Sequence, residues 1–269
     1  MIRILFALAL AALTGSAIAQ AGKVEVLWLG HSAFRITTLT GKVLVIDPWL
    51  RTNPRTPAAY KDLAALGKVD AVLVTHAHFD HLGDAPDLAK LNKARLIASS
   101  TLIRVLLQWT DLPPELGMGM NKSGTVTPLG PDIKITMVRA EHTSEYVRRN
   151  PATGRDEIYE GGEPAGFIVE LENGFKIYHM GDTGLFGDMK LIGELYKPDL
   201  VMAPIGGNFT VNAQLAGYAI RELIKPKYAI PMHYGTLPIL AGKPEDFVKA
   251  LGDSPTRVIV MTPGDGVKF

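Results

Sequence analysis

The chain contains no cysteine among its 269 residues. Disulfide bonds are therefore excluded, and the stability of the fold must come from its buried core. The same absence removes thiolates as catalytic nucleophiles and as metal ligands. Any chemistry that this chain performs has to use oxygen and nitrogen groups.

Clusters of positive charge and low-complexity segments are missing as well. The 28 Lys and Arg residues nearly balance the 27 Asp and Glu residues, which gives a formal net charge of +1. A nucleic-acid partner would need a basic patch to contact its phosphates, so we expect a small-molecule substrate and no nucleic acid. The composition leaves the oligomeric state open.

No apolar run is long enough to cross a bilayer, and we expect no stable insertion into a membrane. The apolar run 4–13 follows Arg3 and precedes the sequence Ala-Ile-Ala at 17–19. This order of a positive charge, a short apolar stretch and small residues is typical of a secretory signal peptide. We therefore expect residues 1–19 to be a signal peptide, residues 20–269 to be a single domain, and the mature protein to be periplasmic or secreted.

Apolar residues with a period of two or of 3.6 predict strands and helices along the rest of the chain. Strands are expected at 24–29, 33–39, 43–46, 69–75, 126–128, 133–138, 166–171, 175–179, 200–203, 228–231 and 257–261. Helices are expected at 85–91, 100–109, 188–196, 213–224 and 245–251. Strands come first and then alternate with helices, an order that favours a layered α/β domain over a barrel or a bundle. The polar run 145–163 is expected to be an aperiodic surface loop and a candidate lid.

Four side chains that can bind a metal lie within six residues, directly after the predicted strand 69–75. They are His76, His78, Asp80 and His81, in the sequence His-Ala-His-Phe-Asp-His. On a strand, positions i and i+2 face the same way, so we expect His76 and His78 to hold one ion. Asp80 and His81 lie past the strand end and can hold a second one. Imidazole and carboxylate groups suit zinc, iron or manganese, whereas calcium prefers an all-oxygen shell. The alternative, a solvated histidine-rich turn, is disfavoured by the buried strand in front of it.

Three further candidates, His142, Asp182 and His233, each follow a predicted strand. Loops at the strand ends of α/β sheets carry the functional groups, so these side chains are candidates for the same site. Taken singly, each could be an ordinary hydrogen-bonded loop residue. Together with the first cluster they predict a metal centre.

Other polar residues are weaker candidates for supporting roles. His31 could orient substrate or a ligand, or it could be a strand-end histidine bonded to backbone. Asp47 could accept a hydrogen bond from a ligating imidazole. For His179, inside a predicted strand, core packing is favoured over ligation. Tyr234 could donate a hydrogen bond to an oxyanion or could simply pack.

The substrate pocket has its own candidates. Asn208 and Thr210 follow two glycines and could line the pocket. Four arginines near the expected lid could bind an anionic substrate, although lone surface arginines are usually only solvated charges. These are Arg139, Arg148, Arg149 and Arg155.

The pattern His-x-His-x-Asp-His, followed by an isolated His, the sequence Gly-Asp-Thr-Gly and a late His, resembles the metallo-β-lactamase superfamily. The resemblance covers residues 24–261. The sequences Leu-Gly-His-Ser-Ala-Phe at 29–34, Pro-Ile-Gly-Gly at 204–207 and Pro-Met-His-Tyr-Gly-Thr at 231–236 are similar to one branch of it. That branch contains the ascorbate-phosphate lactonase and many metal-dependent hydrolases.

The resemblance implies an α/β fold, a four-layer αβ/βα sandwich with metals at the edge between its two sheets. It implies two divalent transition-metal ions, with zinc expected and manganese or iron as alternatives. The implied ligands are His76, His78 and His142 for the first ion, Asp80, His81 and His233 for the second, and Asp182 as a bridge.

Such a site predicts a binuclear hydrolase that uses a metal-bound hydroxide on an ester, a lactone or a phosphoester. A zinc-like ion lowers the pKa of bound water from about 15.7 toward about 7 and polarises the oxygen of the scissile group. Asp80 and His31 are the candidate catalytic residues, because Asp80 could move a proton to the leaving group.

Other functions within the superfamily are partly excluded. The common zinc β-lactamases have a cysteine ligand that this chain lacks, and the diiron oxygen reductases usually have Glu in place of His78. Two alternatives stay open: a mononuclear iron dioxygenase acting on persulfides, and a non-catalytic metal-binding protein of the same fold. The identity and number of bound metal ions would separate them from the hydrolase.

Overall fold

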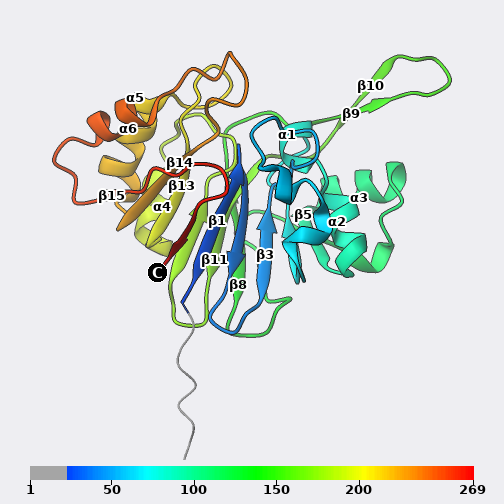
Figure 1. Cartoon of the computed structure of the whole chain (residues 1–269), viewed down its shortest axis with the longest axis horizontal. Coiled ribbons are helices and arrows are strands. Elements are labelled where there is room, and N and C mark those ends of the chain that lie inside the picture. Colours follow the sequence, from blue (N-terminus) through cyan, green and yellow to red (C-terminus); the bar gives the residue numbers. More distant parts are fainter. Residues whose placement is uncertain (1–22) are drawn as a thin grey trace, which may run out of the picture.

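Two β-sheets lie face to face at the centre of the molecule (Figure 1). The computed structural model describes residues 23–269, so the expected signal peptide at 1–19 lies outside the described residues. Among the described residues, no helix has the length and apolarity that a bilayer crossing requires.

The first sheet has seven strands in the order β16-β1-β2-β3-β4-β5-β6. Their bounds are β1 (Glu25–Gly30), β2 (Ala33–Thr37), β3 (Val43–Ile46), β4 (Ala71–Leu73), β5 (Arg95–Ser99), β6 (Gly117–Met120) and β16 (Gly266–Lys268). Pairing is antiparallel from β16 to β3 and parallel from β3 to β6. Parallel strands need helical crossovers, which places helices on one face of this sheet.

The second sheet also has seven strands, in the order β15-β14-β13-β12-β11-β8-β7. Their bounds are β7 (Thr125–Val126), β8 (Lys134–Arg139), β11 (Ala165–Glu170), β12 (Lys176–His179), β13 (Leu200–Pro204), β14 (Tyr228–Met232) and β15 (Arg257–Val258). Strands β12 to β15 run parallel, and the remaining pairs are antiparallel. Each sheet is therefore mixed, with its parallel half connected through helices.

Helices cover the outer face of each sheet (Figure 1). They are α1 (Phe79–Leu82), α2 (Ala85–Asn92), α3 (Ser100–Trp109), α4 (Met189–Tyr196), α5 (Ala213–Tyr218), the π-helical turn η4 (Ala219–Ile224) and α6 (Pro244–Leu251), with short 3-10 turns η1 (Ala58–Tyr60), η2 (Leu63–Leu66) and η3 (Pro114–Leu116). Leu88 of α2 and Leu106 of α3 pack on the first sheet, and Ile192 of α4 and Phe247 of α6 pack on the second. The order helix, sheet, sheet, helix confirms the four-layer αβ/βα sandwich.

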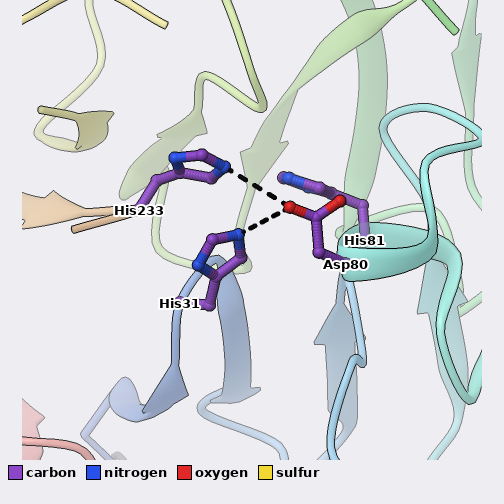
Figure 2. A group of neighbouring side chains, drawn as sticks. All are labelled: His31, Asp80, His81 and His233. Carbon is purple, nitrogen blue, oxygen red and sulfur yellow. Dashed lines mark hydrogen bonds and ion pairs between the residues drawn. The ribbon is translucent and has the colours of Figure 1, made fainter. Parts of the chain in front are cut away.

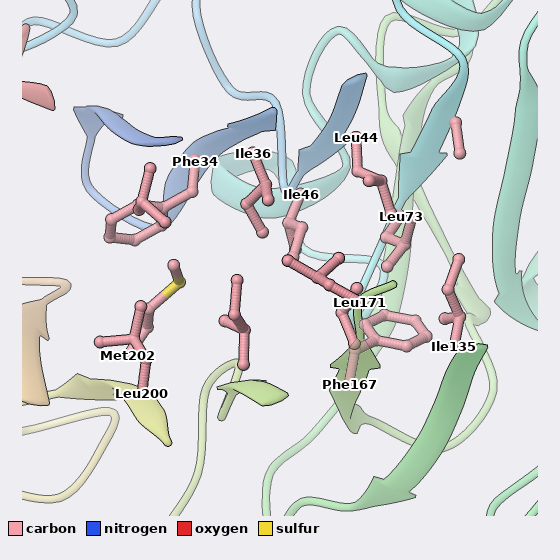
Figure 3. Close-up of a cluster of buried hydrophobic side chains, with 14 of the residues drawn as sticks. Phe34, Ile36, Leu44, Ile46, Leu73, Ile135, Phe167, Leu171, Leu200 and Met202 are labelled. Carbon is pink, nitrogen blue, oxygen red and sulfur yellow. The ribbon is translucent and has the colours of Figure 1, made fainter. Parts of the chain in front are cut away.

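Besides the side chains that pack beneath the helices, a separate cluster of buried side chains fills the space between the sheets (Figure 3). Strand β3 contributes side chains both to the cluster between the sheets and to the cluster beneath the helices. Leu44 and Ile46 point into the space between the sheets, whereas Val43 and Val45 point to the helical layer. Because successive side chains face opposite sides, a strand buried on both faces has to be continuously apolar.

The prediction that residues 145–163 form an aperiodic loop is wrong. This segment forms a hairpin of β9 (Glu145–Arg149) and β10 (Asp156–Glu160) that projects from the body (Figure 1). Asn150 closes its turn, because its side-chain oxygen accepts hydrogen bonds from the N–H groups of Ala152 and Thr153 at 2.9 and 3.2 Å. The strands alternate with a period of two, but polar residues occupy both faces, which hides the pattern in a search for apolar alternation.

Other differences are smaller. The predicted strand 69–75 is shorter as β4, and the predicted helix 213–224 is helical throughout but ends in the π-helical turn η4. Strands β5, β6 and β16 and the single turn α1 were not predicted. They are only three to five residues long, so packing against their neighbours rather than local sequence determines them.

Candidate metal centre

Five loops or turns meet at one edge of the sandwich. His31 follows β1, His142 follows β8, Asp182 follows β12 and His233 follows β14. The remaining side chains lie between β4 and the end of α1; they are His76, His78, Asp80 and His81. Functional groups of α/β sheets gather outside strand ends, and here they do so at the edge between the two sheets.

The turn between β4 and α1 differs from the strand that we expected there. β4 ends at Leu73, so His76 and His78 are not strand residues. Their side chains still meet, with His76 Nε2 3.0 Å from His78 Nδ1. His78 is the residue that precedes the first turn of α1, and that turn carries Asp80 and His81.

Two groups of side chains that share no member have the spacing that a metal ion needs, and a third group, of His76, His81 and Asp182, overlaps both. His76, His78 and His142 offer nitrogen atoms that all lie within 4.8 Å of one another. The second group comprises His31, Asp80, His81 and His233, with the same spacing (Figure 2). The sequence-based sets are thus brought together, and His31, whose role the sequence left open, lies within the second group.

Asp80 is the meeting point of the second group. Its Oδ2 lies 3.0 Å from His31 Nε2 and 3.7 Å from His233 Nε2 (Figure 2). His31 is anchored on its other side, where Nδ1 lies 3.0 Å from the hydroxyl oxygen of Thr236. The buried imidazole of His31 is therefore held at both nitrogens.

Asp182 lies between the two groups. Its carboxylate oxygens lie 3.1 Å from His81 Nε2 and 2.9 Å from His233 Nε2. The same carboxylate is 3.6 Å from Nε2 of His142, a member of the first group. One carboxylate thus reaches nitrogen atoms from both groups.

These contacts are close but are not hydrogen bonds. Within the described residues, His81 Nε2, His233 Nε2 and Asp182 Oδ1 are buried and have no hydrogen-bond partner. Leaving such an atom unpaired in the interior costs about 1–3 kcal/mol. A divalent cation among these lone pairs would satisfy all of them, so the residues present fit a metal ion.

On three histidine rings of the site, a neighbouring oxygen engages one of the two ring nitrogens in a hydrogen bond. Asp47 Oδ2 lies 2.7 Å from His81 Nδ1, which is the bond to a site imidazole that the sequence suggested. Thr75 Oγ1 lies 3.0 Å from His76 Nδ1, and Glu145 Oε2 lies 2.7 Å from His78 Nε2. Sequence reasoning missed Glu145, because it belongs to the hairpin that was predicted as a loop.

The electrostatics of the buried imidazoles differ with their surroundings. Burial lowers the pKa of His76 well below its usual value, and the neighbouring His81 lowers it further. Burial also lowers the pKa of His31 to about 4. At His81 burial has the same effect, but the carboxylates of Asp182 and Asp47 outweigh it and raise the pKa well above the usual value. Asp182 likewise raises the pKa of His233 to about 9 against the effect of burial.

Three residues at this edge have a strained backbone. His31, Asp47 and His233 have φ values of 57°, 48° and 56°, in the left-handed region. Such conformations cost non-glycine residues about 1–3 kcal/mol and persist where the surrounding structure imposes them. Strained residues that converge on one place are typical of a functional site.

A cavity of about 310 Å³ opens over the two groups. Its lining consists of His78, Phe79, Asp80, His142, Thr143, Asp182, Phe209, His233, Leu237 and Leu240. The suggestion that Asn208 and Thr210 line the pocket is wrong. Neither belongs to the lining, whereas Phe209, which lies between them in the chain, does. No sequence pattern marked these apolar residues, since they converge from separate loops.

The other supporting candidates lie outside the cavity. His179 is buried, with Nε2 2.9 Å from the carbonyl oxygen of Ser32 and Nδ1 accepting a hydrogen bond from the Gly181 N–H, as expected for a packed histidine. Tyr234 packs against Trp28, with ring centroids 5.6 Å apart.

The arginines suggested for anion binding do not line the cavity either. Arg139 pairs with Glu141 and Arg149 pairs with Asp156. Arg148 lies over the ring of Trp109, 4.5 Å from its centroid, and pairs with a glutamate of β10.

Similarity to known proteins agrees with this geometry. A family model described as "Beta-lactamase superfamily domain" matches residues 42–234. A UPF0173 metal-dependent hydrolase from Polaromonas sp. is 56% identical over 271 residues, which cover 100% of this chain and 99% of that protein. Igni18, described as a novel metallo hydrolase from the hyperthermophilic archaeon Ignicoccus hospitalis, is 34% identical with a TM-score of 0.78, over 92% of this chain and 98% of that one.

A more distant structure supports the fold alone. The metallo-β-lactamase fold protein YhfI from Bacillus subtilis is 13% identical, with a TM-score of 0.66 over 92% of this chain and 100% of that one. The family match covers more than half of the chain, and the Polaromonas relative aligns along nearly all of both proteins. The chain therefore belongs to the metallo-β-lactamase superfamily, in the family of UPF0173 metal-dependent hydrolases.

Proposed function

We propose that this protein is a binuclear hydrolase for an ester, a lactone or a phosphoester. The observation that carries the proposal is the position of Asp182, whose carboxylate reaches nitrogen atoms of both side-chain groups. We assign His76, His78 and His142 to a first ion, Asp80, His81 and His233 to a second, and Asp182 to both. When bound, divalent ions of this kind activate water near neutral pH and polarise the scissile carbonyl or phosphoryl oxygen.

Three hydrogen bonds support this assignment. Because Thr75 holds Nδ1 of His76 and Asp47 holds Nδ1 of His81, both rings direct Nε2 toward the site. The Glu145 carboxylate holds Nε2 of His78, so that ring directs Nδ1 instead. Fixing the tautomer and the orientation of an imidazole in this way strengthens it as a metal ligand.

The carboxylate of Asp80 is proposed to move the proton. Hydrolysis forms a bond from a water oxygen to the carbonyl carbon or phosphorus and breaks the bond to the leaving oxygen, which then needs a proton. Asp80 lines the cavity and can take the proton from water and return it to the leaving oxygen. His31 holds Asp80 in place, since Nε2 donates to Oδ2 while Thr236 engages Nδ1. We propose His31 as a positioning residue.

The test is hydrolysis by protein loaded with zinc, manganese or iron in turn, on a chromogenic ester, a lactone and a phosphodiester. Turnover should disappear with a chelator and return with metal. Asp182→Asn should lower kcat/KM by at least about a hundredfold, because removal of a single stabilising group at a reacting centre costs that much. Leu195→Ala, at an exposed position on α4, is the control that should leave kcat/KM unchanged.

The two alternatives predict different results. A persulfide dioxygenase would consume oxygen with a persulfide and would hydrolyse none of the three substrates. A non-catalytic metal-binding protein would hold its full metal content and turn over nothing. Either outcome would refute the proposed hydrolase.

A further inference from the structure

The walls of the cavity differ sharply from its floor. The floor consists of five side chains of the metal centre, and the walls are mostly apolar; the five are His78, Asp80, His142, Asp182 and His233. Phe79, Phe209, Leu237 and Leu240 make up most of those walls, with Thr143 as the polar exception. A substrate whose scissile group lies on the floor must therefore place its other parts against apolar side chains.

Two of these side chains are exposed to an extent that needs explanation. Phe79, in α1, is 66% exposed, and Phe209, in the loop after β13, is 56% exposed. Ile239, in the loop that carries the two leucines, is 50% exposed. Exposed apolar residues that gather at the mouth of a polar site are typical of a ligand-binding surface.

Phe79 is also held in place. Its ring meets Trp49 edge to face, with centroids 5.4 Å apart. On its other side a second hollow of about 380 Å³ begins, lined by Trp49, Tyr146 and Val147 among others. Phe79 therefore lines both hollows, as does His78 of the metal centre.

Positive charge is lacking around the cavity. Its lining, as the structure describes it, contains no lysine or arginine. Arg139, Arg148 and Arg149 are paired with carboxylates elsewhere. A phosphate or sulfate group outside the scissile bond would find no cationic side chain in these walls and would have to give up its water there. The sequence resembles a branch that contains a lactonase for a phosphorylated substrate. The lining of this cavity has no cationic side chain that would bind such a phosphate.

We infer that the substrate is a small, uncharged carboxylic ester or lactone with an apolar acyl or aryl group that packs on Phe79 and Phe209. This inference rests on the proposed hydrolase. The volume of about 310 Å³ lies at the lower end of ligand pockets, which span about 300–1,000 Å³, and so favours a small molecule over a polymer. Water adds its oxygen to the carbonyl carbon, the bond to the alkoxy oxygen breaks, and the products are a carboxylic acid and an alcohol, or one hydroxy acid from a lactone.

The test compares 4-nitrophenyl acetate, butanoate and hexanoate with bis(4-nitrophenyl) phosphate and 4-nitrophenyl phosphate, using the metal-loaded protein. Burial of one methylene group corresponds to about a fourfold gain, so kcat/KM should rise by about tenfold or more from acetate to butanoate. Phe209→Ala should flatten this rise, and Leu195→Ala, on the surface of α4, should preserve it.

A binding measurement separates the pocket from the chemistry. Titration calorimetry should give tighter binding of hexanamide than of acetamide to the loaded protein, and Phe209→Ala should remove the difference. Equal turnover along the ester series, or a preference for the phosphoesters, would overturn the inference and leave the hydrolase standing. Hexanamide binding without hydrolysis of any substrate would refute the proposed function but support the apolar pocket. Neither binding nor turnover would refute both.

Discussion

At the scale of the residue, Asp47 supports the metal centre without lining the cavity. It is fully buried and accepts hydrogen bonds from the Thr75 N–H and hydroxyl at 2.8 and 2.7 Å. The same carboxylate engages His81 Nδ1. One side chain at the end of β3 thus fixes both the loop after β4 and an imidazole of the centre.

Asp47→Asn should weaken metal binding. An amide has a single acceptor oxygen, so the variant loses one of these contacts together with the negative charge. Loss of a partner behind a ligating histidine typically costs about 10–100-fold in metal affinity. Competition titration against a chromogenic chelator measures this, with Asp87→Asn, on the surface of α2, as the control. Affinity equal to that of the unchanged protein would show that His81 needs no such support.

At the scale of the element, the single turn α1 depends on the glycine that ends it. Gly83 has a φ of +33°, and a Cβ there would lie 2.6 Å from the Cα of Trp49. No larger residue fits without moving the backbone next to Asp80 and His81.

Gly83→Ala should therefore destabilise the protein by more than about 1 kcal/mol, since the conformation and the contact both oppose a side chain. Urea denaturation of the metal-free protein measures the free energy of unfolding. Gly187→Ala is the matched control, because a Cβ at that position meets nothing within 4 Å. Equal stability of the two variants would contradict this account of α1.

The hairpin turn between β11 and β12 is tied to the first sheet by Glu172. Its Oε1 accepts hydrogen bonds from the hydroxyls of Thr38 and Thr40 at 2.7 and 2.6 Å. Burial opposes ionisation of Glu172, but the bonds from Thr40 and Thr38 outweigh it and lower its pKa.

Glu172→Gln should reduce stability at pH 7 by about 1 kcal/mol, a value discounted because the residue is only half-buried. A lowered pKa in the folded state stabilises the protein above the unfolded pKa of about 4.3, and this stability is lost as the pH falls through the folded value. The difference between variant and unchanged protein should therefore shrink below about pH 4. Denaturant titrations from pH 3 to pH 8 check this; a constant difference would mean that the charge of Glu172 does not matter.

Elements and site could be predicted from the sequence to different degrees. The strands of the core were predictable, because β3 and β13 are short apolar runs that are buried on both faces. The seven metal-competent side chains were predictable, because four of them lie within six residues of the chain. The hairpin β9–β10 was not predictable, since polar residues on both its faces conceal the period of two. The cavity walls were not predictable either, because Phe79 of α1 and Phe209 of the loop after β13 line one cavity only in the folded chain.

At the scale of the whole molecule, the chain without cysteine relies on three apolar layers for its stability. The unpaired atoms of Asp182, His81 and His233 oppose that stability in the absence of metal. A bound ion reverses their effect, because a ligand that binds only the folded state stabilises it.

The export of the protein is a separate proposal. If residues 1–19 are a signal peptide, the mature chain begins at Gln20. Intact-mass analysis of protein recovered from the periplasm or medium of a Gram-negative host should give that mass. Full-length protein confined to the cytoplasm would contradict the proposal.

The most direct test of the metal centre is the metal content per chain, measured by plasma mass spectrometry on protein purified without chelator. The two side-chain groups joined by Asp182 predict about two equivalents of zinc or manganese. About one equivalent of iron would contradict the binuclear hydrolase and would favour the dioxygenase.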